Sequence, residues 1–156
     1  MIGVEITSRG RLLGIDHGNK RIGLAICDAN WTAARPLEIL VRKDRTTDFA
    51  RINSILTKQH IAAIVIGLPE LPEQNPDHPV TDQSHTVRRW ASRLAAAVSL
   101  PVYLWDERYS TFEAEELAAE TGRRGNGPLD DYAAAVILQS FIDEHPAGTP
   151  NPAPIK

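Results

Sequence analysis

RLLGIDHGNKRIGLAIC, residues 11–27, consists of two short apolar runs around a polar connection. The first run is Arg11–Ile15, the second is Ile22–Cys27, and the sequence HGNK lies between them. Two runs of strand length around a connection that contains Gly and Asn are typical of a β-hairpin. The sequence therefore predicts two antiparallel strands near the start of the chain.

Beyond this hairpin the chain alternates between strand-like and helix-like segments. Three further apolar runs have strand length, namely Leu37–Val41, Ile61–Ile66 and Pro101–Trp105. Helical spacing and capping residues predict four helices, which run from Thr46 or Thr47 to Gln59, across Val87–Val98, from the capping box at Ser110 to near Gly122, and from Leu129 to about Asp143. A hairpin followed by this alternation predicts an α/β fold whose mixed sheet has antiparallel strands first, parallel strands after, and flanking helices.

Length and composition predict one soluble domain. A chain of 156 residues is long enough to bury a core, and no apolar run approaches the roughly 20 residues that span a bilayer. The first residues lack the apolar stretch of a secretory signal, and the single cysteine, Cys27, has no partner for an internal disulfide. We therefore expect a cytoplasmic protein without membrane contact, with one domain over residues 1–144. The segment 145–156 contains four prolines and is expected to be a disordered tail.

The net charge of −3 is not that of a typical nucleic-acid-binding protein. Its distribution is uneven, because residues 1–45 carry eight Lys/Arg and five Asp/Glu, a balance of +3, whereas the other 111 residues sum to −6. Such asymmetry permits a local basic surface. The charge alone therefore does not decide whether the protein binds nucleic acid.

Three acidic residues, Asp16, Glu107 and Asp130, lie where predicted strands end or a helix begins. Active sites of open α/β sheets gather at such positions. Phosphodiester hydrolysis requires an activated water and compensation of negative charge, and two divalent cations about 3.5–4 Å apart supply both. Mg²⁺, or Mn²⁺ in its place, takes oxygen ligands, while the His and Cys clusters typical of zinc are absent from the sequence. The three carboxylates thus indicate a metal-dependent catalytic site.

Each carboxylate also has a structural interpretation that the sequence leaves open. Asp16 is interpretable as a turn residue and Glu107 as a member of a local ion pair in a solvated loop. Asp130 is interpretable as a residue that stabilises the first turn of a helix.

Four motifs in order resemble the YqgF/RuvX family, bacterial proteins of the RNase H-like superfamily described as Holliday junction resolvases or pre-16S ribosomal RNA nucleases. The motifs are LGIDHGNKRIGLA (13–25), IVIGLP (64–69), WDERYST (105–111), and Asp130 followed by Ala133-Ala134 and ILQS (137–140). The resemblance spans residues 12–143 and implies an RNase H-like fold. It also implies an acidic triad of Asp16, Glu107 and Asp130 as catalytic residues and metal ligands, with Asp131 as the nearest alternative to Asp130.

Basic residues near these motifs are candidates for contacts with substrate phosphates. They are Lys20, Arg21, Arg108, Arg123 and Arg124. Two segments depart from the family pattern: residues 70–79 are acidic and rich in proline, and the loop 122–127 contains two arginines where relatives are often strongly basic. Both departures reduce the expected number of phosphate contacts.

The resemblance implies a Mg²⁺-dependent endonuclease that acts on structured nucleic acid, with precursor 16S rRNA preferred and a four-way DNA junction as the alternative. A non-catalytic nucleic-acid-binding module is the alternative from another class. A phosphotransferase is disfavoured because the sequence lacks a P-loop. A monomer and a homodimer are both compatible with the sequence.

Overall fold

The computed structural model describes residues 9–69, 82–106, 110–120, 122, 127–147 and 153–155, with the backbone alone at 82 and 110–112. The acidic, proline-rich segment 70–79 therefore lies outside the described residues. The elements, in chain order, are β1 (Arg11–His17), β2 (Arg21–Cys27), β3 (Ala34–Val41), α1 (Arg45–Lys58), β4 (Ile61–Leu68), α2 (Asp82–Ala97), β5 (Val102–Asp106), α3 (Ser110–Glu120) and α4 (Asp130–Asp143).

The five strands form one mixed sheet in the order β3-β2-β1-β4-β5. β1 pairs antiparallel with β2, and β2 pairs antiparallel with β3, whereas β4 runs parallel to both β1 and β5. This topology confirms the predicted α/β fold. Because β1, β4 and β5 are parallel, their carboxyl ends lie at one edge of the sheet, which we call the site edge.

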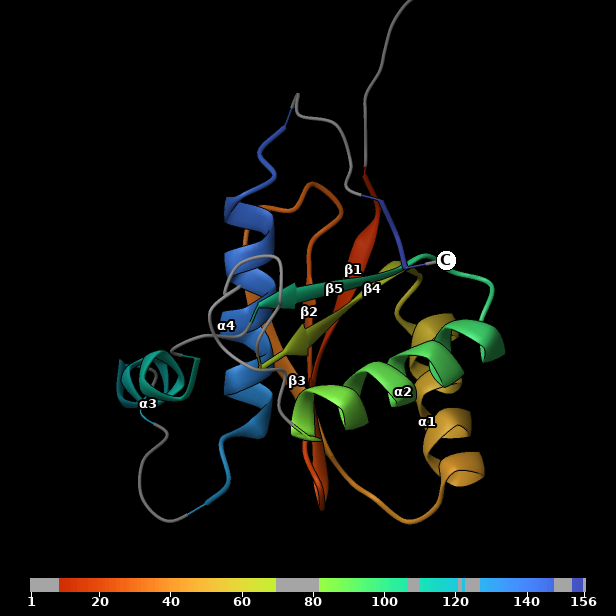
Figure 1. Cartoon of the computed structure of the whole chain (residues 1–156). Helices are drawn as coiled ribbons and strands as arrows, with labels where there is room; N and C mark the ends of the chain where they lie inside the picture. Colours follow the sequence, from red (N-terminus) through yellow and green to blue (C-terminus); the bar gives the residue numbers. More distant parts are fainter. Residues whose placement is uncertain are drawn as a thin grey trace, which may run out of the picture.

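Helices cover both faces of the sheet, with α3 and α4 on one side and α1 and α2 on the other (Figure 1). The strands are apolar on both faces, as expected for central strands between helices. Leu13 and Ile15 point toward the core shared with α1 and α2, whereas Leu12 belongs to the core under α4. The two-residue alternation of β1 therefore assigns Gly14 and Asp16 to the α4 face.

Two glycines allow α4 to lie close to the sheet. A Cβ atom on Gly14 would lie 2.8 Å from the Cβ atom of Leu138, and a Cβ atom on Gly23 would overlap the carbonyl oxygen of Asp130. Gly14 is in β1 and Gly23 is in β2, so both central strands contact the helix through their backbones. The absence of two side chains thus lets α4 lie close to the sheet at its N-terminus, over Gly23, and further along, over Gly14.

The predicted helix starts need one correction. Thr46 and Thr47 do not cap α1, because Asp44 is its N-cap and accepts hydrogen bonds from the Thr47 amide at 2.7 Å and the Thr47 hydroxyl at 3.0 Å. Asp44 precedes Thr46 by two residues and Thr47 by three, and its side chain accepts the hydrogen bond from the otherwise unpaired Thr47 amide. Both threonines therefore lie inside the helix. At the start of α4, Leu129 is the N-cap and makes no side-chain capping bond.

The limits of the predicted domain, residues 1–144, stay a prediction. Within the Pro-rich segment that follows, the Ile155 amide donates a hydrogen bond to the Val102 carbonyl at 2.8 Å. Among the described residues, no helix combines the length and the apolar character needed to cross a bilayer.

Candidate active site

Strand pairing and helix packing bring Asp16 and Asp130 to the same place. Asp16 lies opposite Gly23 in the β1–β2 register. The start of α4 packs directly on Gly23, so the first residue of α4 lies above the cross-strand neighbour of Asp16. Two residues that are far apart in the chain therefore meet on the α4 face at the site edge.

A cavity of about 330 Å³ opens at this point. Its walls come from β1, β2, α3, the loop before α4 and α4 itself, and they consist of Asp16, Arg21, Ala114, Glu115, Gly127, Leu129, Asp130 and Ala133. The cavity, which we call the acidic pocket, contains two of the three predicted catalytic residues. Glu115 is a third carboxylate on its wall, which the sequence did not single out, because nothing in the motifs places α3 against α4.

Arg21 and Asp130 form an ion pair in the acidic pocket, with 2.8 Å between the guanidinium Nε and the carboxylate Oδ2. The side chains are 42% and 22% exposed, so the pair contributes about 0–1 kcal/mol to stability. Its main effect is to orient the Asp130 carboxylate toward β2. Asp130 lies in the first turn of α4, where a carboxylate stabilises the helix, as the structural interpretation expects, and its side chain is also engaged with Arg21.

Asp130, rather than Asp131, lines the acidic pocket. The Asp131 side chain is buried, and its Oδ1 accepts a hydrogen bond from the Tyr132 amide at 3.0 Å. Asp16 lies within β1, paired with Gly23, and is therefore a strand residue and not part of a turn.

The other predicted site residues are only partly described. Lys20 is exposed in the β1–β2 connection, residues 18–20, beside Arg21. Glu107 directly follows β5, and it lies outside the described residues together with Arg108, Arg123 and Arg124.

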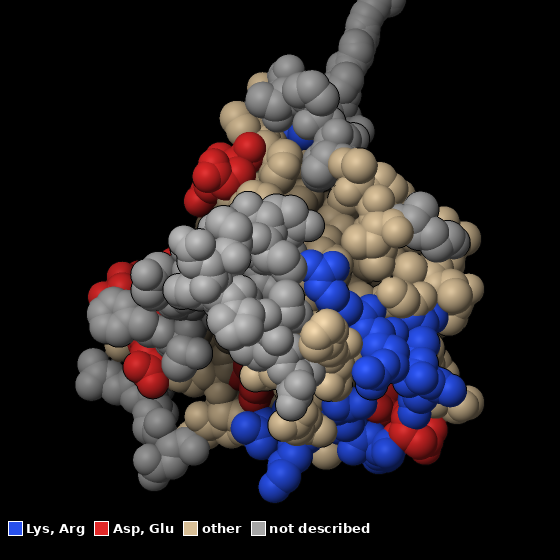
Figure 2. Space-filling view, viewed as in Figure 1, with Lys and Arg blue, Asp and Glu red and all other residues tan. Residues whose placement is uncertain are grey.

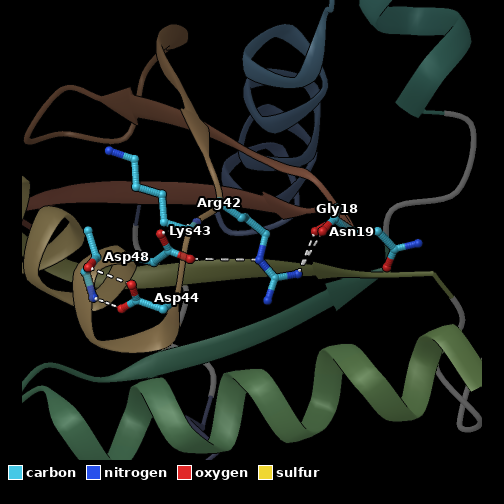
Figure 3. Close-up of polar contacts among 7 residues, drawn as sticks. Gly18, Asn19, Arg42, Lys43, Asp44 and Asp48 are labelled. Carbon is cyan, nitrogen blue, oxygen red and sulfur yellow. Dashed lines mark hydrogen bonds and ion pairs between the residues drawn. The ribbon is translucent and has the colours of Figure 1, made fainter.

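Arg42 lies beside the β1–β2 connection, between that connection and Asp48 (Figure 3). Its guanidinium donates to the carbonyls of Gly18 at 3.0 Å and Asn19 at 3.4 Å, and its amide donates to the carbonyl of Lys20 at 2.9 Å. On its other side, Arg42 Nε lies 3.9 Å from Oδ2 of Asp48, a carboxylate that is only 2% exposed. Arg42 thus links the connection between the two site strands to the first turn of α1, a link that the sequence alone did not reveal.

His17 follows Asp16 but faces the opposite core. Its ring lies 4.7 Å from the ring of Trp90 in α2, and its Nε2 is buried without a hydrogen-bond partner. Burial, and to a smaller extent the positive charge of Arg42, lower the pKa of His17 to about 4. His17 is therefore neutral at physiological pH and belongs to the core rather than to the acidic pocket.

A larger cavity of about 560 Å³ lies between α3 and α4, and neither Asp16 nor Asp130 lines it. The described residues of its wall include five carboxylates and no Lys or Arg: Glu113, Glu116, Glu120, Asp143 and Glu144. Such a wall repels a phosphodiester, so size alone does not identify the active site. The acidic pocket is the better candidate because it combines carboxylates with a cation at the site edge.

Asp16 and Asp130 carry the carboxylate oxygens that hard cations prefer, and Arg21, which pairs with Asp130, lines the same pocket. Among the described residues, no group of three or more His, Cys, Asp or Glu side chains is arranged to hold a metal ion. The described part of the pocket thus provides two oxygen ligands of the right chemistry, and the predicted third ligand, Glu107, follows at the end of β5.

A profile of the family described as "RuvX: Holliday junction resolvase" matches residues 10–144. The chain belongs to this family. Relatives of this RuvX-family chain include a "Putative pre-16S rRNA nuclease" from Synechococcus sp., 39% identical over 135 residues, which cover 85% of this chain and 88% of the relative. A protein with the same description from Zymomonas mobilis is 41% identical over 138 residues, covering 86% and 82% of the two chains.

Solved structures confirm the fold of the RuvX-family chain. RuvC of T. thermophilus, in complex with a Holliday junction substrate, is 18% identical with a TM-score of 0.57, and the match covers 89% of this chain and 97% of RuvC. The Fowlpox virus Holliday junction resolvase is 11% identical with a TM-score of 0.53, and the match covers 86% of this chain and 99% of the viral protein. At this identity the likeness concerns the fold, which is RNase H-like as predicted.

Proposed function

We propose that this chain is a metal-dependent endonuclease that hydrolyses phosphodiester bonds in structured nucleic acid, with 5′-end processing of pre-16S rRNA as its main role. The observation that carries the proposal is the convergence of Asp16 and Asp130 on one pocket at the site edge. The curated relatives described as pre-16S rRNA nucleases support the RNA substrate. The family description supports a four-way DNA junction as the second candidate substrate.

Glu107 is the third proposed catalytic residue. In β5, Tyr103 belongs to the core under α4 and Trp105 packs against the same core. The alternation of a strand predicts the same face for position 107, two residues after Trp105. β5 is also parallel to β4, which is parallel to β1, so the end of β5 shares the site edge with Asp16. This placement supports a triad on the α4 face.

In this mechanism Asp16, Glu107 and Asp130 hold Mg²⁺ or Mn²⁺ through carboxylate oxygens. When bound, such ions acidify a water molecule and compensate the charge that develops on the phosphate. Arg21 orients Asp130 through their 2.8 Å ion pair. Lys20 and Arg21, together with Arg108, Arg123 and Arg124, are the proposed contacts with substrate phosphates. Arg42 holds the β1–β2 connection, and with it the two strands that carry Asp16 and Arg21.

The decisive test is cleavage of an end-labelled pre-16S rRNA fragment and a labelled four-way DNA junction, each with Mg²⁺, Mn²⁺ or EDTA. We expect metal-dependent products from the wild type, with RNA preferred. Asp16→Asn and Asp130→Asn should each lower the cleavage rate by about 100-fold or more while largely preserving substrate binding, because they remove a metal ligand but little of the surface.

Asp143→Asn is the matched control, because Asp143 is a carboxylate at the other end of the same helix and outside the acidic pocket. It should cleave at the wild-type rate. Binding of either nucleic acid without metal-dependent cleavage would contradict the proposal and favour a non-catalytic module. Cleavage of the four-way junction but not of the RNA would instead indicate that the substrate is DNA.

A further inference from the structure

The exposed face of α2 carries a row of basic residues that the proposed active site does not use. The buried face of α2 packs on the sheet and α1 through Val87, Trp90 and Leu94. The opposite face carries Arg88, which is half-buried, and the exposed residues Arg89 and Arg93. Arg89 and Arg93, four residues apart, are neighbours on the helix surface, and Arg88 lies about 100° around the helix from Arg89, toward the buried side.

Among the described residues, no carboxylate forms an ion pair with these three arginines. Within the described part of the chain, ion pairs form at Arg21, Arg42 and Arg51, and none forms at the α2 arginines. Like charges four residues apart, such as those of Arg89 and Arg93, repel each other and weaken a helix. A row of unpaired cations therefore opposes helix stability in the free protein and is suited to an anionic partner.

The opposite side of the molecule has the opposite charge. α3 contains four glutamates and α4 contains three aspartates, and neither helix has a Lys or Arg. In Figure 2 most Lys and Arg side chains gather over α2 and continue below it, with a smaller group of Asp and Glu beside them, whereas the other Asp and Glu side chains in view lie toward α3 and α4. A polyanion that approaches the acidic pocket is therefore repelled from one side and attracted to the other.

The basic face is connected to the site edge. Trp90, which directly follows Arg89, contacts the ring of His17, and His17 is the neighbour of Asp16 in β1. The sheet separates the acidic pocket on its α4 face from α2 on its other face. A nucleic-acid strand that leaves the acidic pocket toward α2 must therefore cross the site edge. Lys20 is exposed in the β1–β2 connection at that edge.

We propose that Arg88, Arg89 and Arg93 of α2 bind the phosphodiester backbone of the substrate beyond the scissile position, so that a structured nucleic acid leaves the pocket over the site edge and lies along α2. This inference rests on the proposed nuclease function. It assigns the recognition of an extended substrate to a helix on the face of the sheet opposite the catalytic carboxylates. Backbone contacts of this kind position a nucleic acid without reading its sequence.

The experiment compares Arg89→Gln/Arg93→Gln with Arg35→Gln/Lys58→Gln. Both variants remove two exposed cations, and the control residues lie outside α2, Arg35 in β3 and Lys58 in the last turn of α1. Fluorescence anisotropy in EDTA gives the Kd of the pre-16S fragment and of the four-way junction at several salt concentrations. Circular dichroism and thermal unfolding establish that each variant is folded.

We expect the α2 variant to bind about tenfold or more weakly, and its slope of log K against log salt to fall by about 1.4 for single strands and about 1.8 for duplex. The control variant should keep the wild-type slope. The cleavage rate at saturating substrate and Mg²⁺ should be unchanged in the α2 variant, because the carboxylates are untouched. The probe with the larger change identifies whether RNA or DNA lies on α2.

Equal affinity and equal slope in the α2 and control variants would overturn the inference while leaving the nuclease proposal intact, provided that the wild type cleaves. Loss of the saturated cleavage rate together with unchanged binding would also overturn it. A wild type that binds and cleaves neither probe would instead overturn the proposed function and, with it, the role of α2.

Discussion

His17 and Asp16 are neighbours in β1 with opposite environments. Asp16 lines the acidic pocket, whereas His17 is 5% exposed and packs on Trp90. Alternation along a strand produces this contrast, since adjacent side chains point to opposite faces. Of these two polar residues at the end of an apolar run, Asp16 therefore faces the acidic pocket and His17 is part of the core.

The buried histidine makes stability depend on pH. The pKa of His17 is about 4 in the folded protein, compared with about 6.5 in an unfolded chain. As the pH falls below 6.5, the unfolded chain binds a proton at this position and the folded protein does not, so stability is lost between about pH 6.5 and 4. We expect the free energy of unfolding to fall by about 2 kcal/mol between pH 7.5 and 5 from this residue alone.

Urea unfolding of the wild type and of His17→Gln at both pH values measures this contribution. The variant is expected to lose about 2 kcal/mol less than the wild type over the same interval, whatever its stability at pH 7.5. The other four histidines are common to both proteins and cancel in the comparison. Parallel pH profiles would contradict the prediction.

At the residue level, the sequence predicted the side chains with a motif around them and missed those that depend on tertiary contact. Asp16 and Asp130 were predicted, and they meet in the acidic pocket. Glu115 and Arg42 were not, because α3 docks on α4 and β3 ends beside the β1–β2 connection only in the folded chain. Spacing within a sequence does not reveal such contacts.

Gly23 illustrates how one element positions another. Its lack of a side chain allows the start of α4 to rest on β2, opposite Asp16. Alanine normally suits a strand better than glycine, but here its Cβ would overlap the backbone oxygen of Asp130. Helix backbone cannot move aside as a flexible side chain can, so α4 would have to shift.

We therefore expect Gly23→Ala to destabilise the protein by about 1–3 kcal/mol or more, and to reduce cleavage because it displaces Asp130 from Asp16. Gly127→Ala is the matched control, since a Cβ atom there has no neighbour within 4 Å, and its free energy of unfolding should change by less than about 1 kcal/mol. Urea unfolding measures both values. Equal stability of the two variants would show that α4 does not depend on Gly23.

At the level of elements, periodicity located all nine helices and strands among the described residues, but several ends differed. β1 extends to His17 and β4 to Leu68, two residues beyond their predicted apolar runs. Asp16 and His17 continue the strand because they pair with Gly23 and Ile22. Backbone pairing, unlike apolar burial, leaves no pattern in a single sequence.

The whole molecule has a basic side and an acidic side, which the uneven charge along the chain predicted only in part. Residues 1–45 carry an excess of positive charge, but the α2 arginines lie in the remaining part of the chain, which is acidic overall. Folding separates them from the glutamates of α3. Net charge therefore conceals a surface suited to a polyanion.

Neutralising the acidic side should strengthen nucleic-acid binding. Glu116→Gln/Glu120→Gln removes two exposed charges from the larger cavity, outside the acidic pocket. Because it weakens repulsion over a distance, we expect the Kd for either probe to fall about two- to fivefold at roughly 0.05 M salt. The difference should disappear at roughly 0.3 M salt, where charges are screened. Anisotropy titrations give both values, and an unchanged Kd at low salt would argue against long-range repulsion.

The hydrogen bond from Ile155 to Val102 lies at β5, which is the outer strand of the sheet. An uncovered outer strand offers free carbonyls and amides to the strands of other molecules and promotes aggregation. Pro154 precedes Ile155 and has no amide with which to continue the ladder. The segment 153–155 thus occupies the Val102 carbonyl of the outer strand. Because Pro154 has no amide to donate, this residue offers no hydrogen bond to a β-strand of another molecule.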